Sequence, residues 1–224
     1  MKLVIFDLDG TLINSIEDLG CAVNHALGVR GLPQREMSEY YMMVGNGVRK
    51  LVQRAMPENL SGDVTLLDDL LGIFMEYYSS HIDINTRPYP GMVELLGRLA
   101  GKGYALAVAS NKFQSGAETL VREFFPDIDF VEVLGNGPGA PLKPSPEVVF
   151  RIMGKASGTG TMDPGACDAV LVGDSETDIR TAANAGIPSV AVKWGFRSVD
   201  YLSGADYLVG SAGELEAAIE AALG

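Results

Sequence analysis

The chain has 224 residues, of which 47% are apolar, so its composition is that of a globular protein rather than a disordered one. Its 17 basic and 29 acidic residues give a formal net charge of −12, which argues against nucleic acid or an anionic membrane surface as a partner. No apolar run approaches the roughly 20 residues of a membrane span. Asp7 and Asp9 also interrupt the N-terminal apolar run before a signal peptide can form. We therefore expect a cytoplasmic protein, monomeric or homodimeric.

The first element expected is a buried strand over residues 3–6 that ends in two carboxylates. Asp7 and Asp9 stand two positions apart, so in a strand their side chains point to the same side. Like charges repel there, and burying either one alone is costly. A divalent cation at this strand end would offset the repulsion.

Residues 15–85 interrupt the strand pattern and are expected to form an all-helical insertion. Three apolar patterns with helical spacing run through it, and Ser15 with Asp18 predicts a capping box at the start of the first. The segment "RPYPG" (87–91) then leads back as a stiff linker. Because both linkers lie beside the first strand's carboxylates, we expect the insertion to work as a lid.

Strand-like runs and helical segments alternate along the rest of the chain. The runs are ALAVA (105–109), FVEVL (130–134), AVLV (169–172) and SVAV (189–192). This alternation predicts an α/β protein with a parallel sheet covered by helices on both faces.

Polar residues follow these runs at their carboxyl ends, where open parallel sheets bind ligands. In chain order they are Ser110, Asn111, Lys112, Lys143, Gly173, Asp174, Glu176 and Asp178. Each one alone has an ordinary structural explanation, such as a helix cap or a solvated loop. Their common position at one sheet edge indicates a single site.

The residue types at this edge suit a magnesium ion and a phosphate. Asp7 and Asp174 offer hard oxygen ligands, and the sequence has no Cys or His cluster to favour zinc. Mg²⁺ would leave coordination positions for water and a substrate phosphate, and would draw an anion to this acidic protein. Lys143 adds a fixed cation, and a carboxylate can act as a covalent nucleophile to form an aspartyl phosphate. The reaction would then proceed by two in-line displacements.

Hydrogen-bond donors for the phosphate are expected beside these carboxylates. We predict that Ser110 and the backbone N–H groups of the turn at Gly10 and Thr11 donate to it, with those of the helix after Asn111.

A second binding element is expected in the insertion. Gly45, Asn46 and Gly47 interrupt the helical pattern and predict a tight turn before a helix that starts at Val48. The positive end of that helix and Arg49 in its first turn would attract an anionic group. We therefore hypothesise that this turn closes over the sheet edge and binds the substrate's non-transferring end. The alternative is a plain helix–helix turn in which Gly supplies a positive φ.

Four motifs in this chain resemble those of the haloacid dehalogenase superfamily, in the same order: "DLDGTL" (7–12), "ASN" (109–111), "KPSP" (143–146) and "GDSETD" (173–178). The stretch "VGNGVRKLV" (44–52) is similar to the small helical cap of phosphoglycolate phosphatases. The resemblance implies a three-layer α/β sandwich with a parallel, Rossmann-like sheet. It places the catalytic core in residues 1–14 and 86–224 and the cap in residues 15–85.

The resemblance also implies roles for the motif residues. Asp7 would be the nucleophile and a Mg²⁺ ligand, and Asp9 the general acid–base, with its backbone carbonyl on the metal. The dehalogenase branch typically lacks this second acid, so Asp9 favours phosphoryl transfer. Ser110 would bind the transferring phosphoryl group, and Lys143 would stabilise its charge.

Two further aspartates would help to bind the metal. Asp174 would be a direct ligand, and Asp178 would act through a water molecule or by contacting the direct ligands. The residues expected to bind substrate are Thr11, Asn46, Gly47, Arg49 and Asn111.

The function predicted is Mg²⁺-dependent hydrolysis of a small phosphorylated metabolite, with 2-phosphoglycolate as the candidate. One alternative is a β-phosphoglucomutase-type enzyme, in which Arg49 and Lys50 would hold a second phosphate. A pyrophosphatase and a non-catalytic phosphorylation-switch module of the response-regulator type are the other two. The segment "KWGF" (193–196) departs from the pattern expected after the fourth motif, and so leaves the substrate open.

Overall fold

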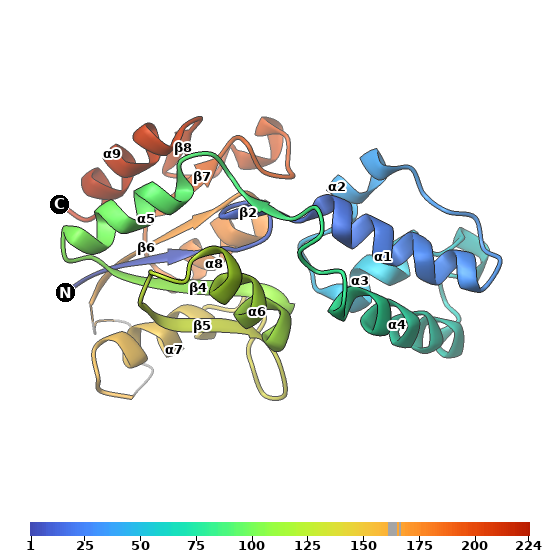
Figure 1. Ribbon diagram of the computed structural model, residues 1–224. Helices are drawn as coiled ribbons and strands as arrows, with labels where there is room; N and C mark the ends of the chain where they lie inside the picture. The colour runs from blue at the N-terminus through green and yellow to red at the C-terminus, as the bar shows by residue number, and fades with distance from the viewer. Residues whose placement is uncertain (161–164, 166) are drawn as a thin grey trace.

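Six parallel strands form the central sheet, in the order β5-β4-β1-β6-β7-β8 (Figure 1). Their bounds are β1 Lys2–Phe6, β4 Ala105–Phe113, β5 Phe130–Asn136, β6 Asp168–Gly173, β7 Ser189–Val192 and β8 Tyr207–Val209. The structure is a computed structural model that describes residues 1–160, 165 and 167–224. Strand β1 lies between β4 and β6, with Phe6 opposite both Val108 and Val172. The carboxyl ends of these three strands therefore meet at one edge.

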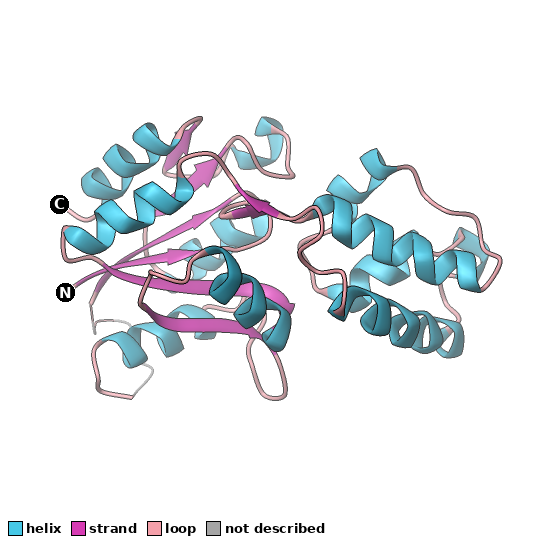
Figure 2. Ribbon diagram, viewed as in Figure 1, coloured by secondary structure: helices cyan, strands magenta, loops and turns pink. Residues whose placement is uncertain are grey.

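Helices cover both faces of the sheet, because neighbouring residues of each strand point to opposite sides. Val4 and Phe6 of β1 belong to one apolar cluster, with residues of α5 (Met92–Gly101), α6 (Gln114–Phe124) and α9 (Ala212–Ala222). Leu3 and Ile5 belong to the other, with α7 (Glu147–Ala156) and α8 (Glu176–Ala185). The layers are visible in Figure 2. The predicted α/β sandwich is confirmed.

Four helices within residues 15–85 form a group to one side of the sheet (Figure 1). They are α1 Ile16–Val29, α2 Tyr40–Met43, α3 Val48–Ala55 and α4 Val64–Ser79, with short 3₁₀ turns at Met37–Glu39 and Glu58–Leu60. Two short strands, β2 (Ile13–Asn14) and β3 (Arg87–Pro88), pair antiparallel where the chain leaves the sheet and returns. This grouping supports our proposed division into a core, residues 1–14 and 86–224, and a cap, residues 15–85.

The capping box predicted at the start of α1 is wrong. Ser15 Oγ donates instead to Asp9 Oδ1 at 2.5 Å. The Asp18 carboxylate accepts from the backbone N–H groups of Asn85 and Thr86 at 2.8–3.0 Å. Both side chains are used across the junction between core and cap, because the return linker brings Asn85 and Thr86, which stand 67 and 68 positions further along the chain, beside Asp18.

Strand β4 is longer than the apolar pattern predicts, and Ser110, Asn111 and Lys112 lie within it rather than after it. The pattern ends at Ala109 because the next residues are polar, although they remain buried at the sheet edge. Strands β2, β3 and β8 are also absent from the sequence prediction. They span only two or three residues each, too few to show an alternating pattern.

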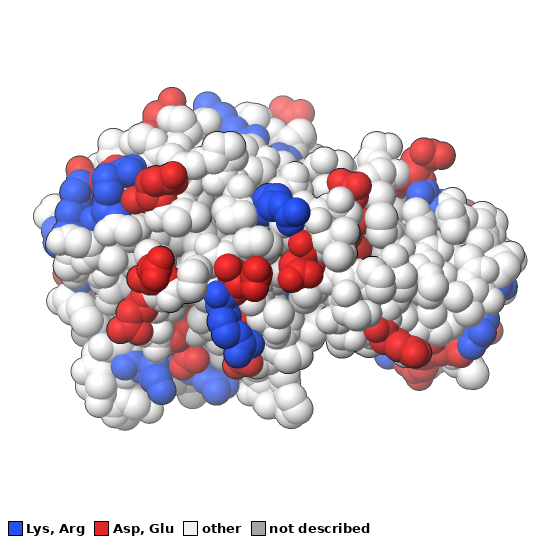
Figure 3. Space-filling model, viewed as in Figure 1, with Lys and Arg blue, Asp and Glu red and all other residues white. Residues whose placement is uncertain are grey.

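Within the described part of the chain, no helix is both long enough and apolar enough to cross a membrane. Acidic and basic side chains are interspersed over the face drawn in Figure 3. The cytoplasmic location and the oligomeric state stay predictions.

Candidate active site

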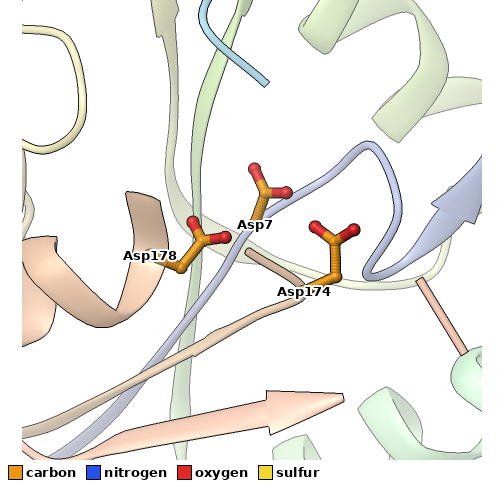
Figure 4. A group of neighbouring side chains, drawn as sticks. All are labelled: Asp7, Asp174 and Asp178. Carbon is orange, nitrogen blue, oxygen red and sulfur yellow. The ribbon is translucent and has the colours of Figure 1, made fainter. Parts of the chain in front are cut away.

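Three buried aspartates meet at the carboxyl edge of the sheet (Figure 4). Asp7 follows β1, Asp174 follows β6, and Asp178 lies in the first turn of α8. One carboxylate oxygen from each lies within 4.8 Å of the others. Because β1 and β6 are adjacent and parallel, the two strand ends bring Asp7 and Asp174 together although 167 positions separate them in the sequence.

Lys143 lies against this cluster as its buried counter-charge. Its Nζ is 2.6 Å from Asp7 Oδ1 and 2.6 Å from Asp178 Oδ1, and its side chain is 3% exposed. Asn111 fixes the lysine from behind: its Oδ1 accepts from the Lys143 N–H at 2.9 Å, and its Nδ2 donates to the Lys143 carbonyl at 3.1 Å. The cation is therefore held by both its backbone and its side chain.

One lysine leaves three buried carboxylates with excess negative charge. Burial, with a smaller effect of the nearby charge of Asp178, raises the pKa of Asp7 to about 7 against the lowering effect of Lys143. The pKa of Asp174 is also well above its usual value, because of burial and the charges of Asp7 and Asp178. A bound cation would relieve this repulsion.

The donor set fits a hard divalent cation such as Mg²⁺. Asp7 and Asp174 are the better placed ligands, since both oxygens of Asp178 are already engaged. Asp178 Oδ1 accepts from Lys143, and its Oδ2 accepts from Ser175 N and Oγ at 3.1 and 2.6 Å. This supports our proposal that Asp178 acts on the metal indirectly.

Two glycines leave room for the Asp174 carboxylate. A Cβ on Gly10 would stand 2.4 Å from Asp174 Oδ2, and one on Gly195 would stand 2.2 Å from Asp174 Cβ and 2.5 Å from the Gly10 carbonyl. The backbone N–H of Phe196 donates to Asp174 Oδ2 at 2.6 Å. The segment that departs from the family pattern, residues 193–196, thus fixes a proposed metal ligand.

Replacing Asp174 with Ala should weaken magnesium binding much more than it lowers the stability of the fold. We expect the half-saturating Mg²⁺ concentration to rise at least about tenfold, because even the loss of a residue that only hydrogen-bonds a metal ligand weakens metal binding by that factor. The measurement is a Mg²⁺ titration of activity, with metal binding followed by calorimetry. Asp168→Asn, at the exposed opposite end of β6, is the matched control. An unchanged titration for Asp174→Ala would reduce Asp174 to a structural role.

Asp9 lies beside the cluster and is held by donors from the core and from the junction. Ser15 Oγ donates to it at 2.5 Å, and Lys112 Nζ lies 3.2 Å from Oδ1 and 3.4 Å from Oδ2. The same Nζ donates to the hydroxyl of Tyr78 on α4 at 2.7 Å. Burial raises the pKa of Tyr78 to about 12. Lys112 thereby links Asp9 to the cap.

One pocket brings together most of the predicted site residues. Asp7, Asp9, Ser110, Asn111, Lys143 and Asp174 line it from the core, and Val44, Gly45, Gly47, Val48 and Leu51 line it from the cap. Asn111 Nδ2 also donates to the Gly45 carbonyl at 2.9 Å. The turn around Gly47 therefore lies over the sheet edge, as we hypothesised.

The side chains of Asn46 and Arg49 are not part of this pocket. Asn46 Oδ1 accepts from Arg54 at 2.7 Å, and Arg49, with a 54% exposed side chain, pairs with Asp68 at 2.6 Å. Helix α3 buries Leu51 on its inner face, which leaves position 49 on the outer face. Both side chains are thus engaged outside the pocket, and their roles in substrate binding stay predictions.

The turn at Gly10 and Thr11 also differs from expectation. The Gly10 N–H donates to the Ile13 carbonyl and the Thr11 N–H to the Leu8 carbonyl, so these groups close the turn rather than face a phosphate. Thr11 is buried, its carbonyl accepts from Trp194 Nε1 at 3.1 Å, and its hydroxyl finds no partner among the described residues. Thr11 therefore supports the loop of Asp7 and Asp9 from outside the pocket.

Arg197 is a pocket residue that the sequence analysis missed. Its guanidinium donates to the carbonyls of Tyr41 and Val44 in the cap and lies 3.3 Å from Glu176. Its position in the sequence could have identified it, because Arg197 follows β7 at the same sheet edge, directly after the "KWGF" segment.

Comparison with known proteins agrees with this geometry. The profile of the haloacid dehalogenase-like hydrolases matches residues 4–192. A phosphoglycolate phosphatase of Mesorhizobium japonicum is 36% identical over 195 residues, which cover 87% of this chain and 83% of that protein. A crystal structure from Lactobacillus delbrueckii subsp. bulgaricus superposes with a TM-score of 0.86 and 34% identity over 97% of each chain. A predicted phosphoglycolate phosphatase from Haemophilus somnus gives a TM-score of 0.83 and 28% identity over 96% of each. The chain therefore belongs to the haloacid dehalogenase-like hydrolase family, as its four motifs predict, and is similar to the phosphoglycolate phosphatases within it.

Proposed function

We propose that this protein hydrolyses a small phosphomonoester with Mg²⁺ through an aspartyl-phosphate intermediate, and that 2-phosphoglycolate is its substrate. The family and its relatives support a phosphoric monoester hydrolase. The observation that carries the mechanism is the placement of Asp7, which shares a buried pocket with Lys143 and Asp174 under the cap turn. That arrangement presents a nucleophilic carboxylate beside a fixed cation and a metal-binding carboxylate.

In the first displacement, a carboxylate oxygen of Asp7 attacks phosphorus, and the bond from phosphorus to the leaving oxygen breaks. Lys143 already occupies Asp7 Oδ1, and no described residue donates to Oδ2, so Oδ2 is the oxygen available for attack. Asp9 gives its proton to the departing alkoxide. Ser110, on the pocket wall, hydrogen-bonds the phosphoryl oxygens.

In the second displacement, water attacks the phosphorus of the aspartyl phosphate while Asp9 accepts its proton. The bond to the Asp7 oxygen breaks, and inorganic phosphate leaves with the carboxylate restored. Lys143 stays next to the Asp7 oxygens throughout and offsets their charge. Mg²⁺, held by Asp7, Asp174 and the Asp9 carbonyl, would supply positive charge for the transferring phosphoryl group.

The mutase alternative requires a second phosphate site in the cap, and the structure gives it no support. Arg49 is paired with Asp68 at the surface. Lys50 Nζ donates to Gln53 and lies outside the catalytic pocket. The cap wall of that pocket is largely apolar, with Val44, Val48 and Leu51, which also disfavours a pyrophosphate.

Phosphate release from a panel of phosphoesters, with Mg²⁺ and with EDTA, tests the proposal. We expect release only with Mg²⁺, and kcat/KM for 2-phosphoglycolate at least about tenfold above that for p-nitrophenyl phosphate, the scale of one charge-assisted hydrogen bond. Equal rates in EDTA would contradict the metal dependence. A preference for another phosphomonoester would keep the phosphatase and overturn the substrate.

A further inference from the structure

Three cationic side chains line the catalytic pocket in the described part of the chain: Lys112, Lys143 and Arg197. Two of them are bound by proposed catalytic carboxylates. Lys143 contacts Asp7 at 2.6 Å, and Lys112 contacts Asp9 at 3.2 Å. Arg197 has no such assignment, although its side chain is only 5% exposed. A buried guanidinium at this position needs a reason.

The hydrogen bonds of Arg197 leave its charge only partly balanced. Two of its partners, the carbonyls of Tyr41 and Val44, are neutral. Its one carboxylate partner among the described residues is Glu176, at 3.3 Å and with a 32% exposed side chain. A guanidinium has five N–H donors, and these three contacts leave it capacity for another acceptor.

The guanidinium lies on the cap side of the pocket, against the turn at Gly45. Its Nη2 is 3.4 Å from the position that a Cβ on Gly45 would occupy, and the φ of Gly45 is +115°. Gly45 therefore allows the cap turn to pass close by without a side chain pressing on Arg197. The positive charge also reaches Asp174, where it opposes the rise of that carboxyl's pKa caused by burial and by the other aspartates.

We propose that Arg197 binds a carboxylate on the non-transferring end of the substrate, so that the enzyme selects short phosphorylated carboxylic acids. This inference rests on the proposed phosphatase function and assigns the residue that recognises the carboxylate of its substrate. The planar guanidinium matches a carboxylate through two parallel hydrogen bonds. The Tyr41 and Val44 carbonyls hold the group in place beforehand, so little side-chain freedom is lost on binding.

The same contacts connect recognition to the cap. Arg197 comes from the core, and two of its acceptors are backbone carbonyls of the cap. A carboxylate bound by Arg197 would therefore lie where core and cap meet, against the turn at Gly45 and the apolar side chains of Val48 and Leu51. The proposed site thus replaces Arg49 and Asn46, which the sequence predicted for this task.

The experiment compares matched substrates that differ only in the carboxylate. Suitable pairs are 2-phosphoglycolate with ethyl phosphate and 3-phosphoglycerate with glycerol 1-phosphate. We expect Arg197→Met to lower kcat/KM for the carboxylates about 10- to 100-fold, the worth of a charge-assisted hydrogen bond, and to change the neutral partners less than about threefold. Arg197→Lys keeps the charge and should recover part of the selectivity. Arg122→Met, an exposed arginine near the end of α6, is the control for loss of one charge.

A second variant tests the site without removing the arginine. Glu176→Gln removes the carboxylate that competes for Arg197, and should lower KM more for the carboxylate substrates than for their neutral partners. Binding of phosphonoacetate and methylphosphonate by calorimetry, with Mg²⁺ present, gives a readout that does not need turnover. Wild type should prefer phosphonoacetate, and Arg197→Met should lose that preference.

Equal losses for both members of a pair would overturn the proposal and leave Arg197 as a structural contact between core and cap. Wild-type enzyme that hydrolyses both members equally well would also overturn it, while the phosphatase function stood. If no phosphomonoester is hydrolysed, the proposed function fails. The phosphonate preference then decides about Arg197 on its own.

Discussion

Replacing Asp7 with Asn should abolish turnover while the protein stays folded. The change is nearly isosteric, but it removes the proposed nucleophile and a metal ligand together. Loss of a nucleophile in a well-studied hydrolase costs about 10⁶-fold in kcat, so we expect a fall of at least about 10⁴-fold here. The measurement is kcat with 2-phosphoglycolate and with p-nitrophenyl phosphate on protein shown by mass spectrometry to be free of deamidated Asp7. A normal kcat in that protein would contradict covalent catalysis by Asp7.

The same variant should be more stable than wild type when no metal is bound. Burial and the charge of Asp178 raise the folded-state pKa of Asp7 from 3.8 to about 7. The ionised carboxylate therefore costs stability progressively as pH rises through this range, and the full cost is present above about pH 7. In EDTA at pH 8, Asp7→Asn should melt higher than wild type, by about 2–4 °C for each kcal/mol relieved. The difference in melting temperature between the two proteins should vanish towards pH 4, and an equal difference at both pH values would contradict this account.

Asp9→Asn should behave differently, because the nucleophile and the backbone carbonyl of residue 9 remain. Proton transfer to the leaving group and from water is lost, and such transfers contribute roughly 10²–10⁴-fold. We expect a loss of that size with 2-phosphoglycolate. With p-nitrophenyl phosphate, whose leaving group needs no proton, the first displacement should be partly rescued.

Stopped-flow detection of p-nitrophenolate separates the two displacements in Asp9→Asn. Ser15→Ala is a useful companion, since it removes the 2.5 Å hydrogen bond to Asp9 but leaves the carboxyl group in place. We expect it to lose less activity than Asp9→Asn and to keep the same dependence on leaving group as wild type. Equal losses of Asp9→Asn on good and poor leaving groups would rule out the acid–base role.

The sequence predicts the fold class well, because the apolar patterns that mark strands and helices are local features of the sequence. The strand over residues 189–192 is found with the predicted bounds, and helix α3 starts at Val48 as expected. Burial of strands on both faces makes them continuous apolar runs that are readily recognised. The short strands that join core and cap carry too few residues for such a pattern.

The proposed site is predictable where it depends on strand ends, and much less so where it depends on helix rotation. Asp7 and Asp174 meet because the adjacent parallel strands β1 and β6 end at one edge, and Lys143 reaches them from the loop after β5. Arg49 falls on the outer face of α3, and no local signal in the sequence shows which way a short cap helix turns. Arg197 depends on contacts with residues more than 150 positions away, which no spacing rule describes.

The most direct test of the account is to trap the phosphoryl group on Asp7. The Asp9→Asn protein, mixed with p-nitrophenyl phosphate and Mg²⁺, should release a burst of one p-nitrophenolate per active site, because the first displacement needs no proton donor and the second lacks its base. Quenching with borohydride, which reduces acyl phosphates, should then place the modification at Asp7 by peptide mass mapping. Steady p-nitrophenolate release without a burst, and with Asp7 unmodified, would mean that water attacks the substrate directly and would contradict the central claim.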